Sequence, residues 1–302
     1  MRFPPSVSLA LALVPLSASA GVKEVAPPGA ESPVAALSKV YVESSYTFEG
    51  DLDREDSSEH FERADVWFAK AGFEQSIPVG PQDWFLKVGL RYTYVGIGET
   101  DAPLPDTLQG LSVPVGIEWR KKTGVPLSKF SLTFNPGIYF SEDISANDFD
   151  IPTSIAYGFD LSDDLRLYVG AFGGIMNQYP VLPGGGLAWR FHRGGLLSLT
   201  FPQGGLYIFP SEQWEIFAGA EWFNLTHRTD DDEAVPGPLR DAILSYREIR
   251  AGLGIKYKPT DRLSVGLNGG YTLDREWDYE RAGYTLDQEN APYVKATFEL
   301  RF

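Results

Sequence analysis

The sequence predicts an all-β fold, an antiparallel up-and-down transmembrane β-barrel of 12–14 strands. Three observations predict it. Apolar and polar residues alternate along most of the chain, and short connections alternate with long ones. After the first 20 residues no run of eighteen apolar residues occurs, which excludes helical membrane spans. A mean hydropathy of −0.18 is expected of a barrel, where only alternate residues meet lipid.

The N-terminal segment reads as an export signal followed by a tail. Residues 1–20 combine a basic start at Arg2, a short apolar stretch over 7–16 and the small residues Ala18-Ser19-Ala20, as in a cleaved signal peptide. The chain has no Cys, so a cysteine-linked lipid anchor is not expected. Residues 21–38 are rich in Pro and Ala and predict a disordered periplasmic tail. Residues 39–302 then form the barrel as one domain.

The strand pattern is clearest where polar residues oppose a row of apolar ones. Glu215 and Glu221, for example, oppose a row that runs from Trp214 to Trp222. Such alternation predicts strands with one face toward lipid and one toward the interior. The same pattern occupies residues 84–96, 111–120, 165–174, 214–222, 249–257 and 263–273.

Connection lengths orient the barrel. The short turns are polar and contain Ser, Asp or Pro, and we expect them on the periplasmic side. The long connections are richer in acidic residues, and we expect them outside the cell. The short turns lie at 161–164, 210–213 and 259–261, and the long connections lie at 50–59, 99–110, 142–150, 229–241 and 277–290.

The strand count depends on residues 187–210, which contain two Gly-Gly pairs. Separate short strands there give fourteen in total, whereas a kinked or inward-folded segment gives twelve. Both ends in the periplasm require an even number. The alternation also breaks at Val66-Trp67-Phe68, which suggests a bulge, and Pro114 suggests a bulge or break in another strand.

Aromatic residues are expected in two belts at the membrane interfaces. One belt lies beside the short turns and the other near the long loops. The first comprises Trp84, Phe159, Trp214, Tyr257 and Phe302, and the second comprises Tyr92, Tyr94, Tyr139, Phe140, Trp222, Phe223 and Tyr271.

The final strand carries the most specific signal. From Tyr293 to Phe302, apolar residues alternate with mostly polar and charged ones, and the chain ends on an aromatic residue. This resembles the closing strand of bacterial outer-membrane β-barrels. The resemblance implies that Phe302 is an insertion signal read by the barrel-assembly machinery. It also implies a location in the cell outer membrane of a Gram-negative-type bacterium, with outer-membrane lipids and lipopolysaccharide as partners.

A finer resemblance covers a Gly-rich part of the chain. Residues 182–189, followed by 199–202 and Tyr207, resemble a family of exported barrels of unknown function. This likeness implies no assigned activity.

Charged residues opposite the lipid-facing rows are expected to line the lumen. Their mixed sign predicts either a narrow, weakly selective channel or a lumen filled by its own ion pairs, because sequence does not fix the barrel radius. The candidates are Lys87, Arg91, Glu118, Arg120, Arg166, Glu215, Glu221, Glu248, Arg250, Lys256, Lys295, Glu299 and Arg301.

The net charge of −15 arises mainly in the long loops, for example at Asp230-Asp231-Asp232-Glu233. Acidic loops argue against nucleic-acid binding, which needs a basic surface. They predict solvation or weak divalent-cation binding, but no loop has the spacing of a calcium loop, so no metal site and no cofactor are assigned.

Catalysis is not expected. His60 follows Ser57 and Ser58 in a loop, which is a flexible place for a nucleophile. His227 has Asp230 near it but no Ser close in sequence, and His192 lies at a probable turn. No catalytic residue is assigned, and the chain is not expected to be an enzyme. The function predicted is a passive channel or small-solute transporter whose solute is unknown. The alternative is a closed structural or adhesion barrel without transport.

Overall fold

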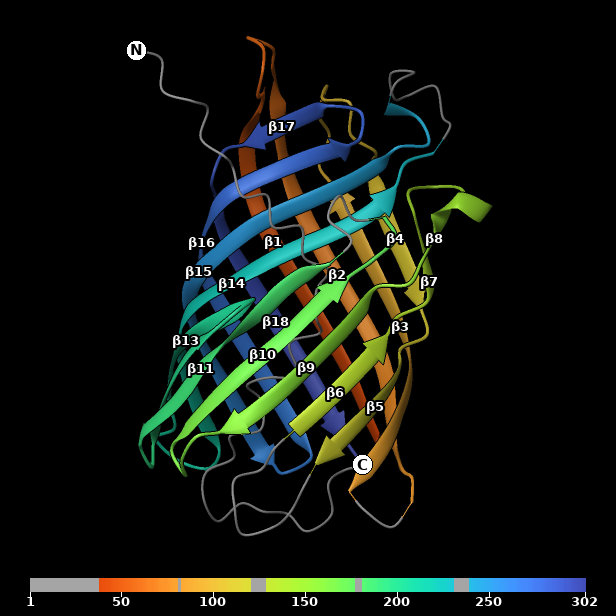
Figure 1. Cartoon of the computed structure of the whole chain (residues 1–302). Coiled ribbons are helices and arrows are strands. Elements are labelled where there is room, and N and C mark those ends of the chain that lie inside the picture. Colours follow the sequence, from red (N-terminus) through yellow and green to blue (C-terminus); the bar gives the residue numbers. More distant parts are fainter. Residues whose placement is uncertain (1–37, 81–82, 121–128, 177–180, 231–238) are drawn as a thin grey trace, which may run out of the picture.

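The computed structural model describes residues 38–80, 83–120, 129–176, 181–230 and 239–302, so the expected signal peptide and nearly all of the tail lie outside it. These residues form one antiparallel sheet that closes on itself (Figure 1). Its first segments are β1 (Ser38–Arg54), β2 (His60–Pro78), β3 (Trp84–Ile97), β4 (Thr107–Ser112), β5 (Val115–Arg120), β6 (Lys129–Phe134), β7 (Gly137–Phe140), β8 (Phe149–Asp150) and β9 (Thr153–Asp160). The remainder are β10 (Leu165–Gly173), β11 (Leu182–His192), β12 (Gly195–Thr200), β13 (Gln203–Ile208), β14 (Trp214–Arg228), β15 (Ile243–Thr260), β16 (Leu263–Glu280), β17 (Tyr284–Gln288) and β18 (Pro292–Arg301).

Closure joins the two ends of the barrel domain. β1 pairs with β18 from Lys39 opposite Arg301 to Thr47 opposite Tyr293. Ser38 and Phe302 exchange backbone hydrogen bonds of 3.1 and 3.0 Å at the end of this pair. Closure leaves no free first or last edge, which is the form that a sheet must take in lipid.

The barrel has fourteen strands, so the alternative of twelve is wrong. Four crossings are each built from two segments: β4 with β5, β6 with β7, β8 with β9, and β17 with β18. The first three breaks lie at Pro114, Pro136 and Pro152, each of which lacks an N–H for the sheet. The expected break at Pro114 is therefore confirmed. Across these breaks Val113 N–H donates to Pro136 O at 2.9 Å, and Asn135 N–H donates to Pro152 O at 2.8 Å.

Residues 187–210 supply β11, β12 and β13, and the last two are only six residues long. The neighbouring β14, β15 and β16 have 15, 18 and 18 residues. The β12–β13 hairpin consequently ends part-way up the wall, where Trp222 N–H donates to Pro202 O at 2.9 Å. Beyond Trp222, β14 has a pairing partner only in β15 among the described strands.

The break in alternation at Val66-Trp67-Phe68 is not a bulge, so that expectation is wrong. β1 and β2 pair in unbroken register from Ser38–Gln75 to Thr47–Val66, and the register shifts lie farther along, between Thr47 and Leu52. Trp67 is 46% exposed, whereas Val66 and Phe68 are buried. Both faces of β2 are apolar here, so the sequence lacks the alternation that would identify a regular strand.

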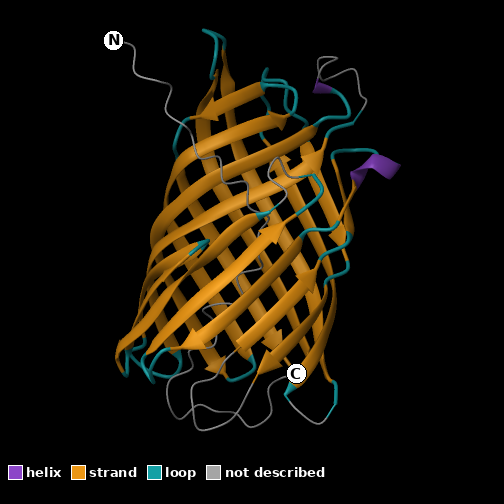
Figure 2. Cartoon of the chain, in the orientation of Figure 1, coloured by secondary structure: helices purple, strands orange, loops and turns teal. Residues whose placement is uncertain are grey.

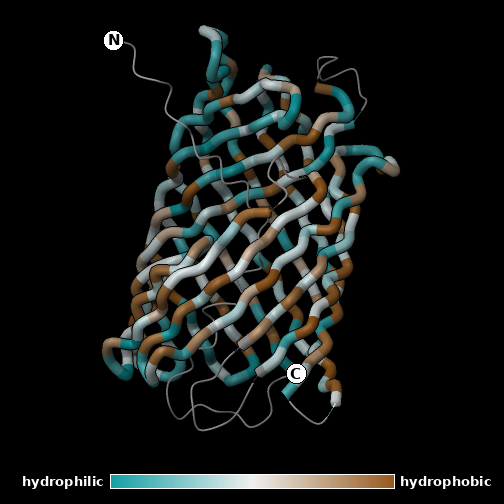
Figure 3. Tube along the Cα trace, in the orientation of Figure 1, coloured by the Kyte–Doolittle hydropathy of each residue, from teal (hydrophilic) through white to brown (hydrophobic). Residues whose placement is uncertain are grey.

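The outer wall is apolar. Large hydrophobic side chains recur along the strands, and hydrophilic segments gather in the loops at the upper end (Figure 3). Trp84, Trp214 and Phe302 are exposed at the short-turn end, as are Tyr92 and Tyr271 nearer the long loops. Phe140 and Phe223 are buried, so their expected place in the outer belt is wrong.

The long loops and the short turns lie at opposite ends of the barrel, with the C-terminus at the short-turn end (Figure 2). The one short helix described, η1 (Ala146–Asp148), belongs to a long loop. Among the residues that the structure describes, no helix is long and apolar enough to cross a membrane.

Candidate functional site

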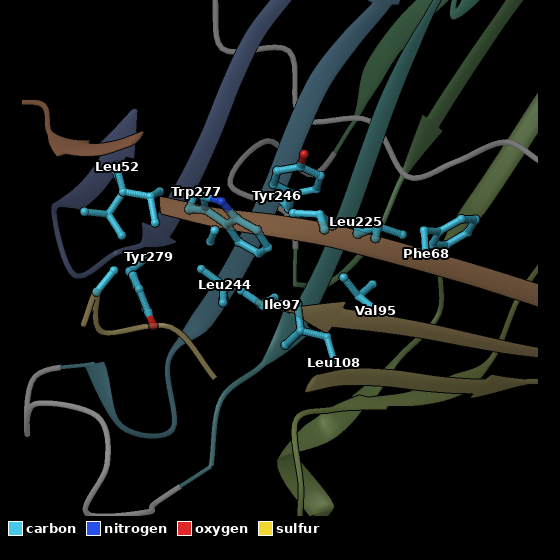
Figure 4. Close-up of a cluster of buried hydrophobic side chains, with 14 of the residues drawn as sticks. Leu52, Phe68, Val95, Ile97, Leu108, Leu225, Leu244, Tyr246, Trp277 and Tyr279 are labelled. Carbon is cyan, nitrogen blue, oxygen red and sulfur yellow. The ribbon is translucent and has the colours of Figure 1, made fainter. Parts of the chain in front are cut away.

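The lumen is filled at its long-loop end by an apolar cluster, which we call the outer seal (Figure 4). Sixteen buried residues from eight wall segments and two loops form it. Trp277, Tyr246 and Leu244 have no exposed surface at its centre. The members are Leu52, Ala64, Val66, Phe68, Val95, Ile97, Ala102, Leu108, Phe223, Leu225, Leu239, Leu244, Tyr246, Trp277, Tyr279 and Leu286.

A ring contact crosses the lumen within the seal. Phe68 of β2 and Phe223 of β14 meet edge to face with centroids 4.9 Å apart, although β15, β16, β18 and β1 separate these strands along the wall. Tyr246 and Trp277 are paired on the adjacent strands β15 and β16, and their ring centroids lie 4.2 Å apart. The contact across the lumen and this cross-strand contact leave the outer lumen packed like a protein interior.

Loops fasten the rim above the seal. The Asp230 carboxylate accepts hydrogen bonds from the backbone N–H groups of Glu142 and Asp143, at 2.6 and 2.8 Å. Arg228 donates to the carbonyl oxygen of Asn147 at 3.0 Å. The loop after β7 is thereby tied to the end of β14, over the wall that β12 and β13 leave short.

Beneath the seal, seven side chains of alternating charge form a continuous row, which we call the charge ladder. Its members come from six consecutive segments of the wall, β14, β15, β16, β18, β1 and β2, and the contact between Glu221 of β14 and Lys295 of β18 passes over β15 and β16. In order its members are Arg275, Glu248, Arg250, Glu221, Lys295, Glu43 and Lys70, and the successive N···O distances are 3.7, 2.5, 3.8, 2.9, 3.3 and 3.0 Å.

Burial changes along the charge ladder. The side chains of Arg275, Glu248 and Arg250 are 0% exposed, against the base of the seal. The other four members are 11–18% exposed. Water therefore reaches the members from Glu221 to Lys70, while Arg275, Glu248 and Arg250 are dry.

A hydrogen bond and a cation–π contact join the buried members of the charge ladder to the outer seal. Tyr246 O–H donates to the Glu248 carboxylate at 2.8 Å. The Arg250 guanidinium lies 4.0 Å from the centroid of the Phe223 ring and donates to Ser45 Oγ at 3.0 Å. Buried charges need such partners, because desolvation offsets much of the attraction within an ion pair.

The other predicted lumen residues also face inward with partners. Lys87 pairs with Glu118, and Arg166 pairs with Asp160. Arg91 lies 3.8 Å from Glu74 and donates to the Tyr41 hydroxyl at 3.0 Å. Glu215 lies 3.7 Å from Lys256 and 3.0 Å from Lys258, and Glu299 lies 2.8 Å from Arg301. The side chain of Arg120 lies outside the described part.

The sequence predicted four of the seven members of the charge ladder and missed Arg275, Glu43 and Lys70. No strand was predicted for β1, and β2 was read as irregular, so Glu43, Lys70 and Glu74 were not assigned to the lumen. The sequence did contain a pattern that indicates this, because Lys70, Gly72 and Glu74 are alternate residues of β2 and therefore lie on the same face of the strand. Lys39, Lys258, Asp160 and Arg275 were missed as well.

The histidines do not form a catalytic group with one another. His60 contacts Asp53 in an exposed outer loop. His192 accepts a hydrogen bond from Gly194 N–H at a short turn, at 3.1 Å. His227 is buried against the Tyr139 ring, and neither of its ring nitrogens has a hydrogen-bond partner among the described residues.

The acidic outer rim holds carboxylates with altered protonation. Glu276 contacts Arg247 beyond Leu273, the last exposed apolar residue of β16. Burial raises the pKa of Glu276 to about 7 against the attraction of Arg247, and burial also raises the pKa of Asp278. Within the described ranges, no group of three or more His, Cys, Asp or Glu is placed to hold a metal ion.

Comparison with solved structures finds bacterial outer-membrane barrels. An outer-membrane channel from Pseudomonas putida F1 matches with a TM-score of 0.49 and 12% identity over 91% of this chain and 99% of the other. A deletion mutant of the TodX monoaromatic hydrocarbon channel matches with a TM-score of 0.38 and 12% identity over 89% and 91%. The KdgM porin matches with a TM-score of 0.32 and 10% identity over 87% and 99%.

No family model matches the chain, and no curated protein matches it in sequence. The expected resemblance to bacterial outer-membrane β-barrels is confirmed for the fold, through the closed antiparallel fourteen-stranded wall.

Proposed function

We propose that this chain is a channel for small solutes in the outer membrane of a Gram-negative-type bacterium, closed at its outer end in the present state. The apolar wall and the even number of strands support the location. The observation that carries the channel function is the water-accessible half of the charge ladder. Charged side chains that keep contact with water are the lining that a polar solute path through a barrel needs.

The outer seal acts as the gate in this proposal. It consists of side chains from the wall and two loops, with no separate plug domain among the described residues. Small shifts of β14 and the loop after β7 would separate Phe223 from Phe68 and admit water. Opening would also expose the dry end of the charge ladder, which then continues the polar path.

The second candidate, a closed structural or adhesion barrel, is favoured by the same seal. Sixteen buried apolar residues stabilise a closed state, since each large side chain contributes about 1.5–3 kcal/mol when buried. In that case the loops above the seal would carry the function and the lumen would conduct nothing.

Conductance in planar bilayers separates the two candidates. The unsubstituted protein and Trp277→Ala are compared, with Trp214→Ala on the lipid face as the matched control. A channel predicts brief unitary steps for the unsubstituted protein. For Trp277→Ala it predicts an open probability at least about tenfold higher, because removing a buried Trp costs the closed state several kcal/mol. Silence of folded protein and of folded Trp277→Ala would overturn the channel function.

A further inference from the structure

The carboxylates inside the barrel are shared between cations. Five of them, Glu43, Glu74, Glu215, Glu221 and Glu248, each lie within 4.0 Å of two cationic side chains. Eight different cations make these contacts, an excess of three over the five carboxylates. The eight are Lys39, Lys70, Arg91, Arg250, Lys256, Lys258, Arg275 and Lys295.

Three further ion pairs of the interior each add one charge of either sign. They are Lys87 with Glu118, Arg166 with Asp160 and Arg301 with Glu299. Asp150 lies on the same inward face as Arg91 and reduces the excess to two, so these described interior charges are still net positive in a chain whose total charge is −15. The surplus of acid lies in the outer loops, so the interior and the outer rim have opposite signs.

The charge ladder, which lines the proposed path of the solute, also has more cations than carboxylates. It begins and ends with a cation, Arg275 beneath the seal and Lys70 at the hydrated end. Lys70 and Lys295 both contact Glu43 and retain 15% and 11% exposure. A hydrated cation beside a shared carboxylate can offer an N–H donor to a passing anion, and the low-dielectric wall strengthens that attraction.

We propose that the channel selects small anions, such as carboxylates or phosphate, which pass along the charge ladder by contacting Lys70 and Lys295. This inference rests on the proposed channel function. The outer acidic rim does not oppose it, because exposed charges there are screened within about 8–10 Å at physiological salt.

Reversal potentials across a KCl gradient test the selectivity. They are measured on the unsubstituted protein and on Trp277→Ala, whose longer openings give the clearest currents. We expect chloride to be more permeant than potassium. Lys70→Gln and Lys295→Gln should each lower the chloride-to-potassium permeability ratio at least about twofold, because each removes one positive charge from the proposed path. Glu43→Gln should raise the ratio.

Arg63→Gln is the matched control, because it removes the same charge from an exposed outer residue, 63% accessible and paired with Asp51. Lys258→Gln repeats the test at a 37% exposed position if the Lys70 variant does not fold. A conducting channel with equal or potassium-favouring permeability would overturn the anion selectivity and leave the channel function standing. Silence of every folded variant would instead overturn the channel function, and the selectivity with it.

Discussion

The Phe68 and Phe223 rings meet edge to face, with their centroids 4.9 Å apart and their planes at 81°, although they belong to strands on different sides of the lumen. This contact lies within the outer seal. It also joins the two layers of the site, because the Phe223 ring supports the Arg250 guanidinium at 4.0 Å. A change in the packing of the outer seal at Phe223 is therefore expected to displace Arg250 of the charge ladder.

Phe68→Ala should destabilise the barrel by about 3–5 kcal/mol, the usual loss when a buried Phe leaves a cavity. The measurement is urea unfolding in lipid vesicles. Phe73→Ala removes the same atoms on the same strand from a lipid-facing position that is 39% exposed, and it should cost clearly less. Equal losses would mean that the seal contributes no more than lipid contact does.

Arg250→Met should cost about 3–5 kcal/mol, because the buried Glu248 then keeps the hydrogen bond from Tyr246 but loses its nearer cation, which leaves Arg275 at 3.7 Å. The control is Arg301→Met, which removes a 38% exposed partner of Glu299 and should cost less than about 1 kcal/mol. Restoration of stability by Glu248→Gln in the Arg250→Met background would identify the uncompensated carboxylate as the cause. Failure of that double variant to recover would contradict this reading.

Glu276 predicts a pH dependence of stability at the outer rim. Its pKa of about 7 in the folded protein exceeds the ordinary value of 4.5, so the folded state binds the proton more tightly than the unfolded state. This group therefore favours folding below pH 4.5, and its contribution declines as the pH rises through 7.

Unfolding free energies at pH 4 and pH 8 check this effect. Glu276→Gln should lessen the decline between the two by about 2–3 kcal/mol relative to the unsubstituted protein. Glu59→Gln changes an exposed carboxylate of the outer loops and serves as the control. An unchanged decline in Glu276→Gln would show that this carboxyl titrates normally.

Deletion of Phe302 should reduce the amount of folded barrel in the outer membrane while export to the periplasm continues. The residue is 57% exposed at the end of β18, where the assembly machinery would meet it. Surface labelling and heat-modifiable gel mobility measure assembly, and periplasmic fractionation measures export. Replacement by Tyr should largely preserve assembly, whereas normal assembly of the deletion would remove this role.

The wall of the barrel could be predicted from sequence because lipid imposes a period of two on any strand that crosses it. Rows such as Ile249 to Tyr257 therefore had only one reasonable interpretation. The hairpin of β12 and β13 was harder, because six-residue strands with several glycines carry little alternation. Their pairing along β11 and β14 decided the count in favour of fourteen.

The seal could not be predicted, because the expectation that inward residues are polar fails at Phe68, Val95 and Leu244. Apolar residues on both faces remove the alternation that marks a barrel strand. The contact between Phe68 and Phe223 depends further on the tilt and stagger of the strands, which a sequence does not specify. Its only trace was an apparent loss of phase in β2.

The short β12–β13 hairpin makes the barrel wall weaker there than between the long strands. β12 and β13 are held together by four residue pairs, whereas β14 and β15 share fifteen. Under lateral tension in the bilayer, we expect the wall to part first between β12 and β13. The rim hydrogen bonds of Asp230 and Arg228 connect β14 to the loop after β7 above this hairpin.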